Sequence, residues 1–320
     1  MTDKENKEIN NWEKSIIEKL ATDSLKERRR ARRWGIFFKI LTFGYIGIFV
    51  YLAFPENLEF NNPDDSKKHI ALVKLNGLIA PSQGVAADTV IKGLNKAFSH
   101  KGTVAVILKI NSPGGSPVQS SYIQKEINRL KNKHAKIPIY TVVGDVCASG
   151  GYYVASATDK IFVNESSIVG SIGVLMNGFG FTEALKSLGI ERRLITSGEH
   201  KDILDPFSPM SDFDEAYAKK LLKNLHTNFI EAVKDGRGDK LSESPEIFSG
   251  LFWPGKEAIE LGLADEIGNV GYIKREVVGV DKVIDFTETE DPLARIINKL
   301  GAVMATTFIQ LSNLSIYPKM

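Results

Sequence analysis

The chain has 320 residues, enough for one or two domains, and its 43% hydrophobic and 25% charged residues are typical of a folded globular protein. Its formal net charge is only +2, which argues against a nucleic acid as partner. Cys147 is the single cysteine, so an intrachain disulfide is excluded.

A cluster of arginines precedes the most apolar stretch of the chain. Five arginines lie within residues 28–33, and residues 34–54 then carry one charge, Lys39. Because about 20 apolar residues suffice for a helix to cross a bilayer, we predict one transmembrane helix at 34–54. A cleaved signal peptide fits less well, since the apolar run and its leader are too long; a buried core helix is the other alternative. The arginines predict that segment 1–33 is cytoplasmic and that everything after Pro55 lies outside the cytoplasm.

Beyond a polar linker at 55–68, the pattern becomes α/β. Short apolar runs alternate with helical segments, an order that favours parallel strands joined by right-handed crossovers. The expected strands are 69–75, 103–110, 137–143, 161–163, 168–175 and 192–196, and the expected helices are 89–98, 119–130, 182–188 and 214–233. A turn, a short helix and a last strand are expected across 249–268. Strand 103–110 is almost continuously apolar, which is typical of a strand buried on both faces.

The long helix and the histidines lead to further expectations. Helix 214–233 carries a stripe at a spacing of four that we interpret as core, namely Tyr217, Leu221, Leu225, Phe229 and Val233. His69, His134 and His226 lie in linker or charged helical surroundings and are expected at the surface. The amphipathic segment 292–320 is too charged to span a membrane, and we expect it to pack on a neighbouring subunit or to lie on the bilayer.

Ser149 lies in a glycine-rich turn between a predicted strand and a predicted helix start, in the run GDVCASGGYY at 144–153. Glycines on both sides allow the backbone to bend sharply there, and amides at a helix N-terminus favour negative charge. Such a turn suits a nucleophile whose reaction passes through an oxyanion. The competing interpretation is an ordinary glycine turn in which the serine only caps the helix.

A second glycine-rich turn, INSPGG at 110–115, follows another predicted strand. Ligands of open α/β sheets bind beyond the carboxyl ends of the strands. If the two strands are neighbours, the amides of Gly115 and Gly150 face one point near Ser149 Oγ and form an oxyanion hole.

Two adjacent residues, His200 and Lys201, are candidates for the base that deprotonates Ser149. A lysine has an ordinary pKa near 10.4, so it must be buried among apolar groups to act as a base. Ser171 is a candidate for the hydroxyl that orients the amine. The residues alone leave the choice between a Ser-His-Asp triad and a Ser-Lys dyad open.

Five motifs, in order along the chain, resemble the signal peptide peptidase A family, membrane-anchored serine proteases of the Clp/crotonase superfamily. They are INSPGG at 110–115, GDVCASGGYYVA at 144–155, VGSIGV at 169–174, SGEHKD at 197–202 and GKEAIELGLADEIG at 255–268. The resemblance covers about residues 70–271. It implies a Clp/crotonase-like superhelix of repeated ββα units for an α/β peptidase domain at 69–291.

The resemblance also implies a role for each candidate site residue. Ser149 is then the nucleophile and Lys201 the general base. Ser171 orients the lysine, and Gly115 and Gly150 supply the oxyanion amides, with Gly114 as an alternative to Gly115. Cys147 is a packing residue. No cofactor and no metal are implied.

The implied function is that of a membrane-anchored serine endopeptidase that degrades cleaved signal peptides and other hydrophobic, membrane-derived peptides. The chain resembles the short, single-domain form of the family, which implies a homo-oligomer with the dyad shared between protomers. The implied place is the bacterial cytoplasmic membrane, with the peptidase domain on its outer side. An acyl-CoA hydratase or isomerase and a catalytically silent membrane scaffold of the same fold are the alternatives.

Overall fold

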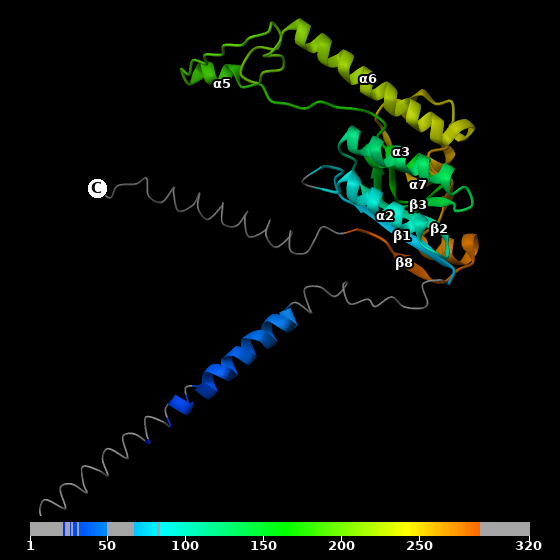
Figure 1. The fold of residues 1–320 in the computed structure, drawn as a ribbon. Helices are drawn as coiled ribbons and strands as arrows, with labels where there is room; N and C mark the ends of the chain where they lie inside the picture. The colour runs from blue at the N-terminus through cyan, green and yellow to red at the C-terminus, as the bar shows by residue number, and fades with distance from the viewer. Residues whose placement is uncertain are drawn as a thin grey trace, which may run out of the picture. The chain divides into compact units, whose positions relative to one another are not determined.

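The computed structural model describes residues 67–81 and 84–288 and, nearer the N-terminus, residues 22, 26, 28–30 and 32–49. The N-terminal residues and the rest belong to separate units, which are taken one at a time. In the first unit, residues 32–49 form an exposed helix (Figure 1).

The transmembrane helix predicted at 34–54 is not confirmed. Its last five residues, 50–54, lie outside the described residues. Within the described part of the chain, no helix combines the length and the apolar character that a membrane span needs. Most of segment 1–33, most of the linker 55–68 and the amphipathic segment 292–320 also lie outside the described residues.

The second unit is built on an eight-stranded mixed sheet, which confirms the α/β class. The repeated ββα superhelix stays a prediction. The strands are β1 (His69–Asn76), β2 (Thr103–Ser112), β3 (Ile139–Ala148), β4 (Lys160–Val163), β5 (Ile168–Gly170), β6 (Phe252–Pro254), β7 (Glu266–Ile267) and β8 (Val283–Asp285). Their order is β6-β5-β3-β2-β1-β8, while β4 pairs with β3 and β7 with β4. β1, β2 and β3 are parallel neighbours, and β5 and β6 are antiparallel.

Helices connect the strands and cover the sheet. The α-helices are α2 (Ala87–Ser99), α3 (Pro117–Lys133), α4 (Gly150–Ala155), α5 (Thr182–Ser187), α6 (Asp212–Arg237), α7 (Gly255–Glu260) and α8 (Val270–Tyr272). Shorter turns are η3 (Gly238–Lys240), η4 (Pro245–Phe248) and the π-helical η5 (Ile273–Val278). Local sequence fixes the starts of the two long helices. Ser116 accepts a hydrogen bond from the Gln119 amide to begin α3, and Ser211 and Asp214 form a capping box at the start of α6.

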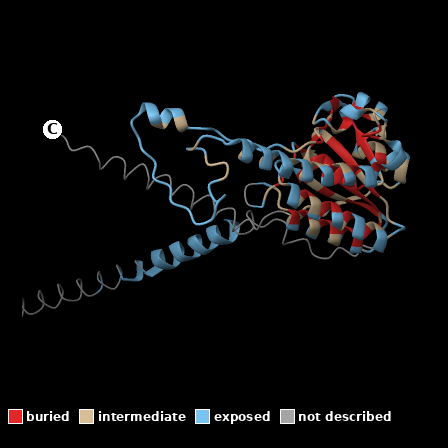
Figure 2. Cartoon of the chain, turned by 90° about the horizontal axis from the view of Figure 1, so that it is seen from above, coloured by how far each residue is buried: buried red, intermediate tan, exposed pale blue. Residues whose placement is uncertain are grey.

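The core has two layers, one on each face of the sheet. Leu108 and Ile110 of β2 pack with residues of α2 and α3, whereas Ile107 packs with Ile273 and its neighbours on the other face. β2 is therefore buried on both faces, as its apolar run predicts. Figure 2 shows the buried residues concentrated in the sheet and on the inner sides of the helices.

The structure corrects several expectations between residues 168 and 233. The strand predicted at 168–175 ends at Gly170, and no strand forms at 192–196. Of the α6 stripe, Phe229 and Val233 are buried, whereas Tyr217 is 51% and Leu221 40% exposed. The amphipathic pattern misleads because only the C-terminal end of α6 packs on the core.

His69 is also not where the sequence predicts it. The side chain is fully buried at the start of β1. Its ring lies 4.8 Å from that of His100 and 6.2 Å from that of Phe286, and its Nε2 lies 3.1 Å from Thr103 Oγ1. His134 and His226 are half-buried, so all three histidines that the sequence places at the surface are less exposed than expected.

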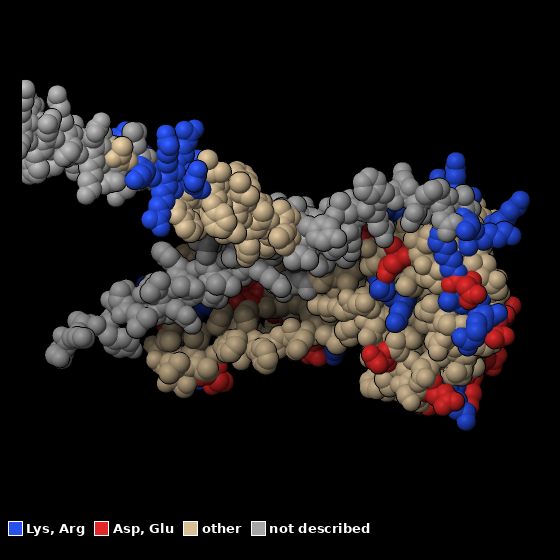
Figure 3. All heavy atoms as spheres, turned by 90° about the horizontal axis from the view of Figure 1, so that it is seen from below, with Lys and Arg blue, Asp and Glu red and all other residues tan. Residues whose placement is uncertain are grey.

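Residues 175–211, here called the arm, extend away from the sheet between β5 and α6 in both ribbon views (Figures 1 and 2). Contacts within the arm hold it together: the Phe181 amide donates to Pro206 O at 2.6 Å, Arg192 pairs with Asp205, and the Arg192 guanidinium lies 5.1 Å above the Phe207 ring. Its exposed large apolar residues are Leu175, Met176, Phe179, Phe181, Leu188, Ile190, Leu194, Ile195, Phe207 and Met210. Figure 3 shows charges of both signs interspersed over the core.

Candidate active site

Ser149 occupies a strained position at the point where β3 ends and α4 begins. Its φ of 50° and ψ of −122° lie in a region that residues other than glycine rarely adopt. Two backbone hydrogen bonds hold it there: its amide donates to Gly170 O at 2.8 Å, and its carbonyl accepts from the Tyr153 amide at 2.9 Å. The side chain does not cap α4 and forms no hydrogen bond with any described residue. The capping interpretation of this serine is therefore not supported, and its hydroxyl is available for chemistry.

The glycine turns after β2 and β3 meet next to Ser149. A Cβ atom built on Gly114 would lie 2.7 Å from both Ser149 Cβ and the Gly150 amide nitrogen. One built on Gly150 would lie 3.2 Å from the Gly115 amide nitrogen. The two strands are parallel neighbours, so both turns lie at the same edge of the sheet. The sequence predicts an oxyanion hole only if the two strands are neighbours, and the structure meets that condition.

The three glycine amides differ in whether they are already engaged. The Gly114 amide donates to Ser112 Oγ at 3.1 Å. Neither the Gly115 amide nor the Gly150 amide has a hydrogen-bond acceptor among the described residues. A bound oxyanion can therefore accept from Gly115 and Gly150 without displacing an existing bond, and Gly114 is the weaker candidate.

Ser171 directly follows Gly170, the last residue of β5, and Ser149 directly follows Ala148, the residue of β3 that pairs with Gly170. Like Ser149 it has a positive φ, 53°, and its amide donates to Leu251 O at 2.6 Å. The structure thus brings Ser149, Ser171 and the glycine turns together.

Lys201 lies elsewhere, on the arm, with its side chain exposed. Its amide donates to Gly198 O at 3.2 Å, but its amine forms no ion pair or hydrogen bond with any described residue. Among the described residues, Lys201 therefore lacks the burial that we expect for a lysine base. His200 is exposed as well, with its ring stacked on Phe213 at 4.2 Å.

Asn111 supports the site but was not singled out in the sequence. Its Nδ2 donates to Asp145 Oδ2 at 3.0 Å, and its Oδ1 accepts from the Val146 amide at 3.0 Å. These bonds hold the stretch where the β2–β3 register shifts, just before Ser149. The INSPGG motif is the signal in the sequence that marks Asn111. The motif does not indicate which groups the side chain contacts.

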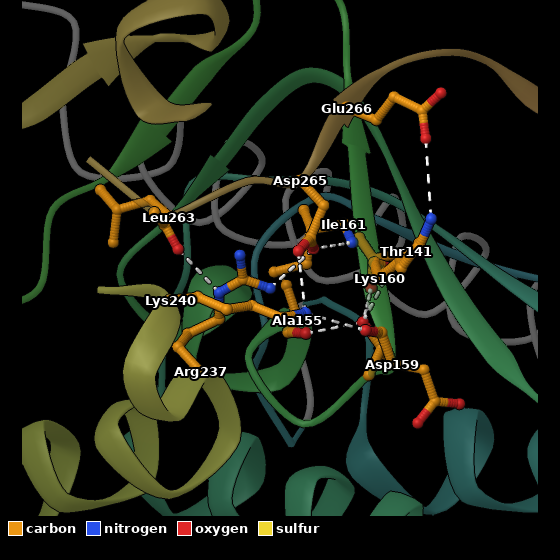
Figure 4. A network of polar contacts seen from close by, with 12 residues as sticks. Thr141, Ala155, Asp159, Lys160, Ile161, Arg237, Lys240, Leu263, Asp265 and Glu266 are labelled. Atoms are coloured by element: carbon orange, nitrogen blue, oxygen red, sulfur yellow. Dashed lines mark hydrogen bonds and ion pairs between the residues drawn. The ribbon is translucent and has the colours of Figure 1, made fainter. Parts of the chain in front are cut away.

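A polar network lies where α6 meets the core (Figure 4). Asp265 Oδ2 accepts from Arg237 Nη1 at 2.7 Å and from the Ile161 amide at 2.7 Å, and Asp265 Oδ1 accepts from Lys240 Nζ at 2.8 Å. Burial favours a higher pKa for Asp265, but the hydrogen bonds from Arg237 and Lys240 outweigh it and hold the pKa below its usual value.

Cys147 and Tyr152, on either side of Ser149, are both fully buried. Burial raises the pKa of the Cys147 thiol far above its usual range, and it does the same for the Tyr152 hydroxyl, which donates to Leu263 O at 2.9 Å. Both groups therefore stay protonated, and Cys147 is a packing residue rather than a competing nucleophile.

Comparison with known proteins assigns the chain to a family. Residues 131–281 match the family described as "Peptidase family S49". A protein of Synechocystis named "Putative protease slr0021" is 31% identical over 236 residues, which cover 72% of this chain and 83% of that protein. The chain belongs to the S49 peptidase family, in which its relatives carry the names SppA and protease 4.

Other relatives are much longer than the matched region. A Brucella abortus protein named "Na(+)/H(+) antiporter NhaA" is 45% identical over 221 residues, which cover 67% of this chain but 30% of that protein. An Enterococcus faecium protein named "Putative signal peptide peptidase SppA" is 32% identical over 211 residues, which cover 63% of this chain and 61% of that protein. The matched region is thus less than two thirds of these relatives, so their names do not carry over as functions of this chain.

Proposed function

We propose that the chain is a serine endopeptidase in which Ser149 attacks the scissile carbonyl and Lys201 is the general base. The observation that carries the proposal is the convergence of two unengaged amides, those of Gly115 and Gly150, beside a strained serine with a free hydroxyl. Membership of the S49 family supports it independently.

The proposed reaction uses these groups in two half-reactions. The neutral amine of Lys201 accepts the proton of Ser149 Oγ as the oxygen bonds to the substrate carbonyl, and the resulting oxyanion accepts hydrogen bonds from the two glycine amides. The proton then passes to the leaving amine as the peptide bond breaks. Water, deprotonated by the same lysine, hydrolyses the acyl-serine and regenerates Ser149. Ser171, beside Ser149, orients the amine.

We further propose that the dyad forms between two copies of this chain. Lys201 lies on the exposed arm, whose apolar residues are of the kind that mark an interaction surface. Burial of the arm against a second copy removes water from around the lysine, as a neutral amine requires. Both catalytic groups then come from one gene product, and the active form is a homo-oligomer.

The substrate and the place of action are proposals from the sequence. The arginines at 28–33 followed by the apolar run 34–54 support attachment to the bacterial cytoplasmic membrane with the peptidase unit outside the cytoplasm. Hydrophobic, membrane-derived peptides, including cleaved signal peptides, are the substrates accessible there.

Covalent labelling with a fluorophosphonate probe tests the proposal. Wild-type chain should be labelled at Ser149, and both Ser149→Ala and Lys201→Ala should abolish labelling and peptide hydrolysis. Lys201→Arg should also be inactive, because a guanidinium stays charged and cannot accept the proton. His200→Ala should keep most of the wild-type rate.

The pH dependence of hydrolysis separates the two bases that the sequence leaves open. With a lysine base, the rate rises into the alkaline range; with a histidine base, it steps near pH 6.5. An inactive His200→Ala beside an active Lys201→Ala would replace the dyad by a histidine triad. A folded, oligomeric wild-type chain that is never labelled would instead support the silent scaffold or the acyl-CoA enzyme.

A further inference from the structure

Helix α6 joins the arm to the core, and within the part of the chain that the structure describes only its C-terminal end is buried. Its buried residues are Phe229, Ala232, Val233 and Arg237, all in the last nine of its 26 residues. The N-terminal turns are exposed or half-buried and follow directly from the arm (Figure 1). The direction of α6 therefore depends on how its C-terminal end is held.

That end is held against the elements that carry Ser149 and Ser171. The ring of Phe229 lies 4.9 Å from that of Tyr153 in α4, and His226 Nε2 lies 3.1 Å from Ile172 O. A Cβ atom on Gly236 would lie 2.0 Å from Ser156 O, so the α6 backbone touches the end of α4 directly. This end of α6 packs on the nucleophile half of the site.

Arg237 fixes the last residue of α6 with two hydrogen bonds. Its side chain is 1% exposed, its Nε donates to Gly262 O at 2.9 Å, and its Nη1 donates to Asp265 Oδ2 at 2.7 Å. Asp265 in turn accepts from the Ile161 amide of β4. A planar guanidinium with two fixed donors restrains orientation better than a single flexible cation does. Figure 4 shows Arg237 reaching from α6 into this network.

The length of α6 amplifies small changes at Arg237. Its 26 residues span about 39 Å, so a tilt of about 10° at the C-terminal end moves the N-terminal end by about 7 Å. Stacked rings carry that motion to the loop of Lys201: the Phe213 ring lies 6.1 Å from that of Tyr217 and 4.2 Å from that of His200. A displacement of about 1 Å in a reacting group can already cost about 10²-fold in rate.

We propose that Arg237 and Asp265 are positioning residues for the peptidase reaction, because they set the direction of α6 and thereby the place where Lys201 is presented. The inference rests on the proposed function of Lys201, but the clamp itself is tested without any activity. Lys240 provides the matched control. It also bonds to Asp265, yet it lies in η3, outside α6, and its side chain is 48% exposed.

Pulsed EPR distances test the clamp in the full chain. Spin labels at Lys92→Cys on α2 and Ala216→Cys near the start of α6 occupy exposed sites, and an excess of unlabelled chain suppresses distances between copies. The buried Cys147 serves as the check for background labelling in the parent chain. Arg237→Met should shift or broaden the distance distribution by several ångströms, since about 31 Å of helix separates Ala216 from Arg237. Lys240→Met should leave the distribution unchanged.

Kinetics then connect the clamp to the reaction. Arg237→Met should lower kcat by about 10²-fold with KM close to the wild-type value, whereas a purely structural role would lower kcat only in proportion to the unfolded fraction. A parent-like distance distribution in folded Arg237→Met would overturn the proposal, as would an unchanged kcat.

A second variant applies where Arg237→Met gives no cooperative melt. One alanine inserted after Lys223 turns the helix N-terminal to it by about 100° and leaves the anchored residues 226–237 in place. The insertion should abolish hydrolysis while the core melts normally, and a wild-type kcat would refute the positioning role. If the wild-type chain itself hydrolyses no peptide, the proposed function fails, and the EPR distances still decide whether the clamp directs α6.

Discussion

Gly114→Ala tests whether the oxyanion hole lies where the two glycine turns meet. Gly114 has a φ of 104°, at which a side chain is strained, and its Cβ would lie 2.7 Å from Ser149 Cβ, 2.7 Å from the Gly150 nitrogen and 2.9 Å from Ala148 O. Carbon atoms in ordinary contact lie about 3.5–4.0 Å apart. The turn after β3 must therefore move by roughly 1 Å, and Ser149 and the Gly150 amide move with it.

The expected cost falls on the rate more than on stability. A left-handed backbone at a residue with a Cβ costs about 1–2 kcal/mol, which lowers the melting temperature by only a few degrees in a domain of this size. Loss of one aligned oxyanion donor, which must lie about 2.7–3.1 Å from the oxyanion, lowers kcat by about 10²–10³-fold. We expect Gly114→Ala to fold, to bind peptide with a KM near the wild-type value and to be nearly inactive.

Gly279→Ala is the matched control for backbone strain. Gly279 also has a positive φ, 69°, but a Cβ there would have no heavy atom within 4 Å. The melting temperature of Gly279→Ala should fall by the backbone strain alone, and so by no more than that of Gly114→Ala, while kcat stays unchanged. The assay is hydrolysis of a fluorogenic hydrophobic peptide, with thermal melts of all three proteins. A Gly114→Ala variant with wild-type kcat would refute this location of the oxyanion hole.

Three further predictions address assembly, topology and acid stability. Ser149→Ala and Lys201→Ala chains, each inactive alone, should regain hydrolysis when assembled together, and a lasting absence of activity would place the dyad within one chain. A reporter fused after Met320 should be active only outside the cytoplasm, so cytoplasmic activity would contradict the proposed topology. Because the pKa of Asp265 is lowered in the folded state, its pairing stabilises the fold above the unfolded carboxyl pKa and is lost as pH falls through the folded pKa. Arg237→Met should therefore destabilise the chain by about 1–3 kcal/mol at neutral pH and by less in acid, since Asp265 keeps Lys240 and the Ile161 amide as partners. Urea melts showing a pH-independent difference would contradict this assignment.

Local sequence patterns predict a strand that is buried on both faces and a turn that glycines make locally. The run 103–110 is almost continuously apolar because both faces of β2 are covered, and it predicts a strand that the structure extends to Thr103–Ser112. The turn at Ser149 is predicted because Gly144, Gly150 and Gly151 allow a sharp bend. That property is local and does not depend on the tertiary structure. The contact between Gly114 and Ser149 depends on how β2 and β3 pair in the sheet. The motifs alone do not predict that pairing.

The predictions are wrong where a segment needs a neighbouring strand or a covering surface to adopt the predicted structure. Residues 192–196 include Leu194, Ile195 and Thr196, but a strand forms only when a neighbour satisfies its backbone groups, and none lies beside the arm among the described residues. The stripe on α6 continues beyond the core that covers Phe229 and Val233, so Tyr217 and Leu221 stay exposed. In both cases apolar side chains stay exposed, because no surface among the described residues buries them.

The same reasoning explains why the two halves of the proposed site differ so much. The Ser149 half is made of backbone: strained dihedral angles, two amide hydrogen bonds and glycine contacts, all within one sheet edge. The Lys201 half is a side chain on an arm that exposes apolar residues, Ile195 by 95% and Leu175 by 83%. Covering those residues with a second copy would bury apolar surface and exclude water from the amine in one step. Under the proposed function, the free energy that drives assembly would thus also neutralise the base, and peptide hydrolysis would begin only where chains have met.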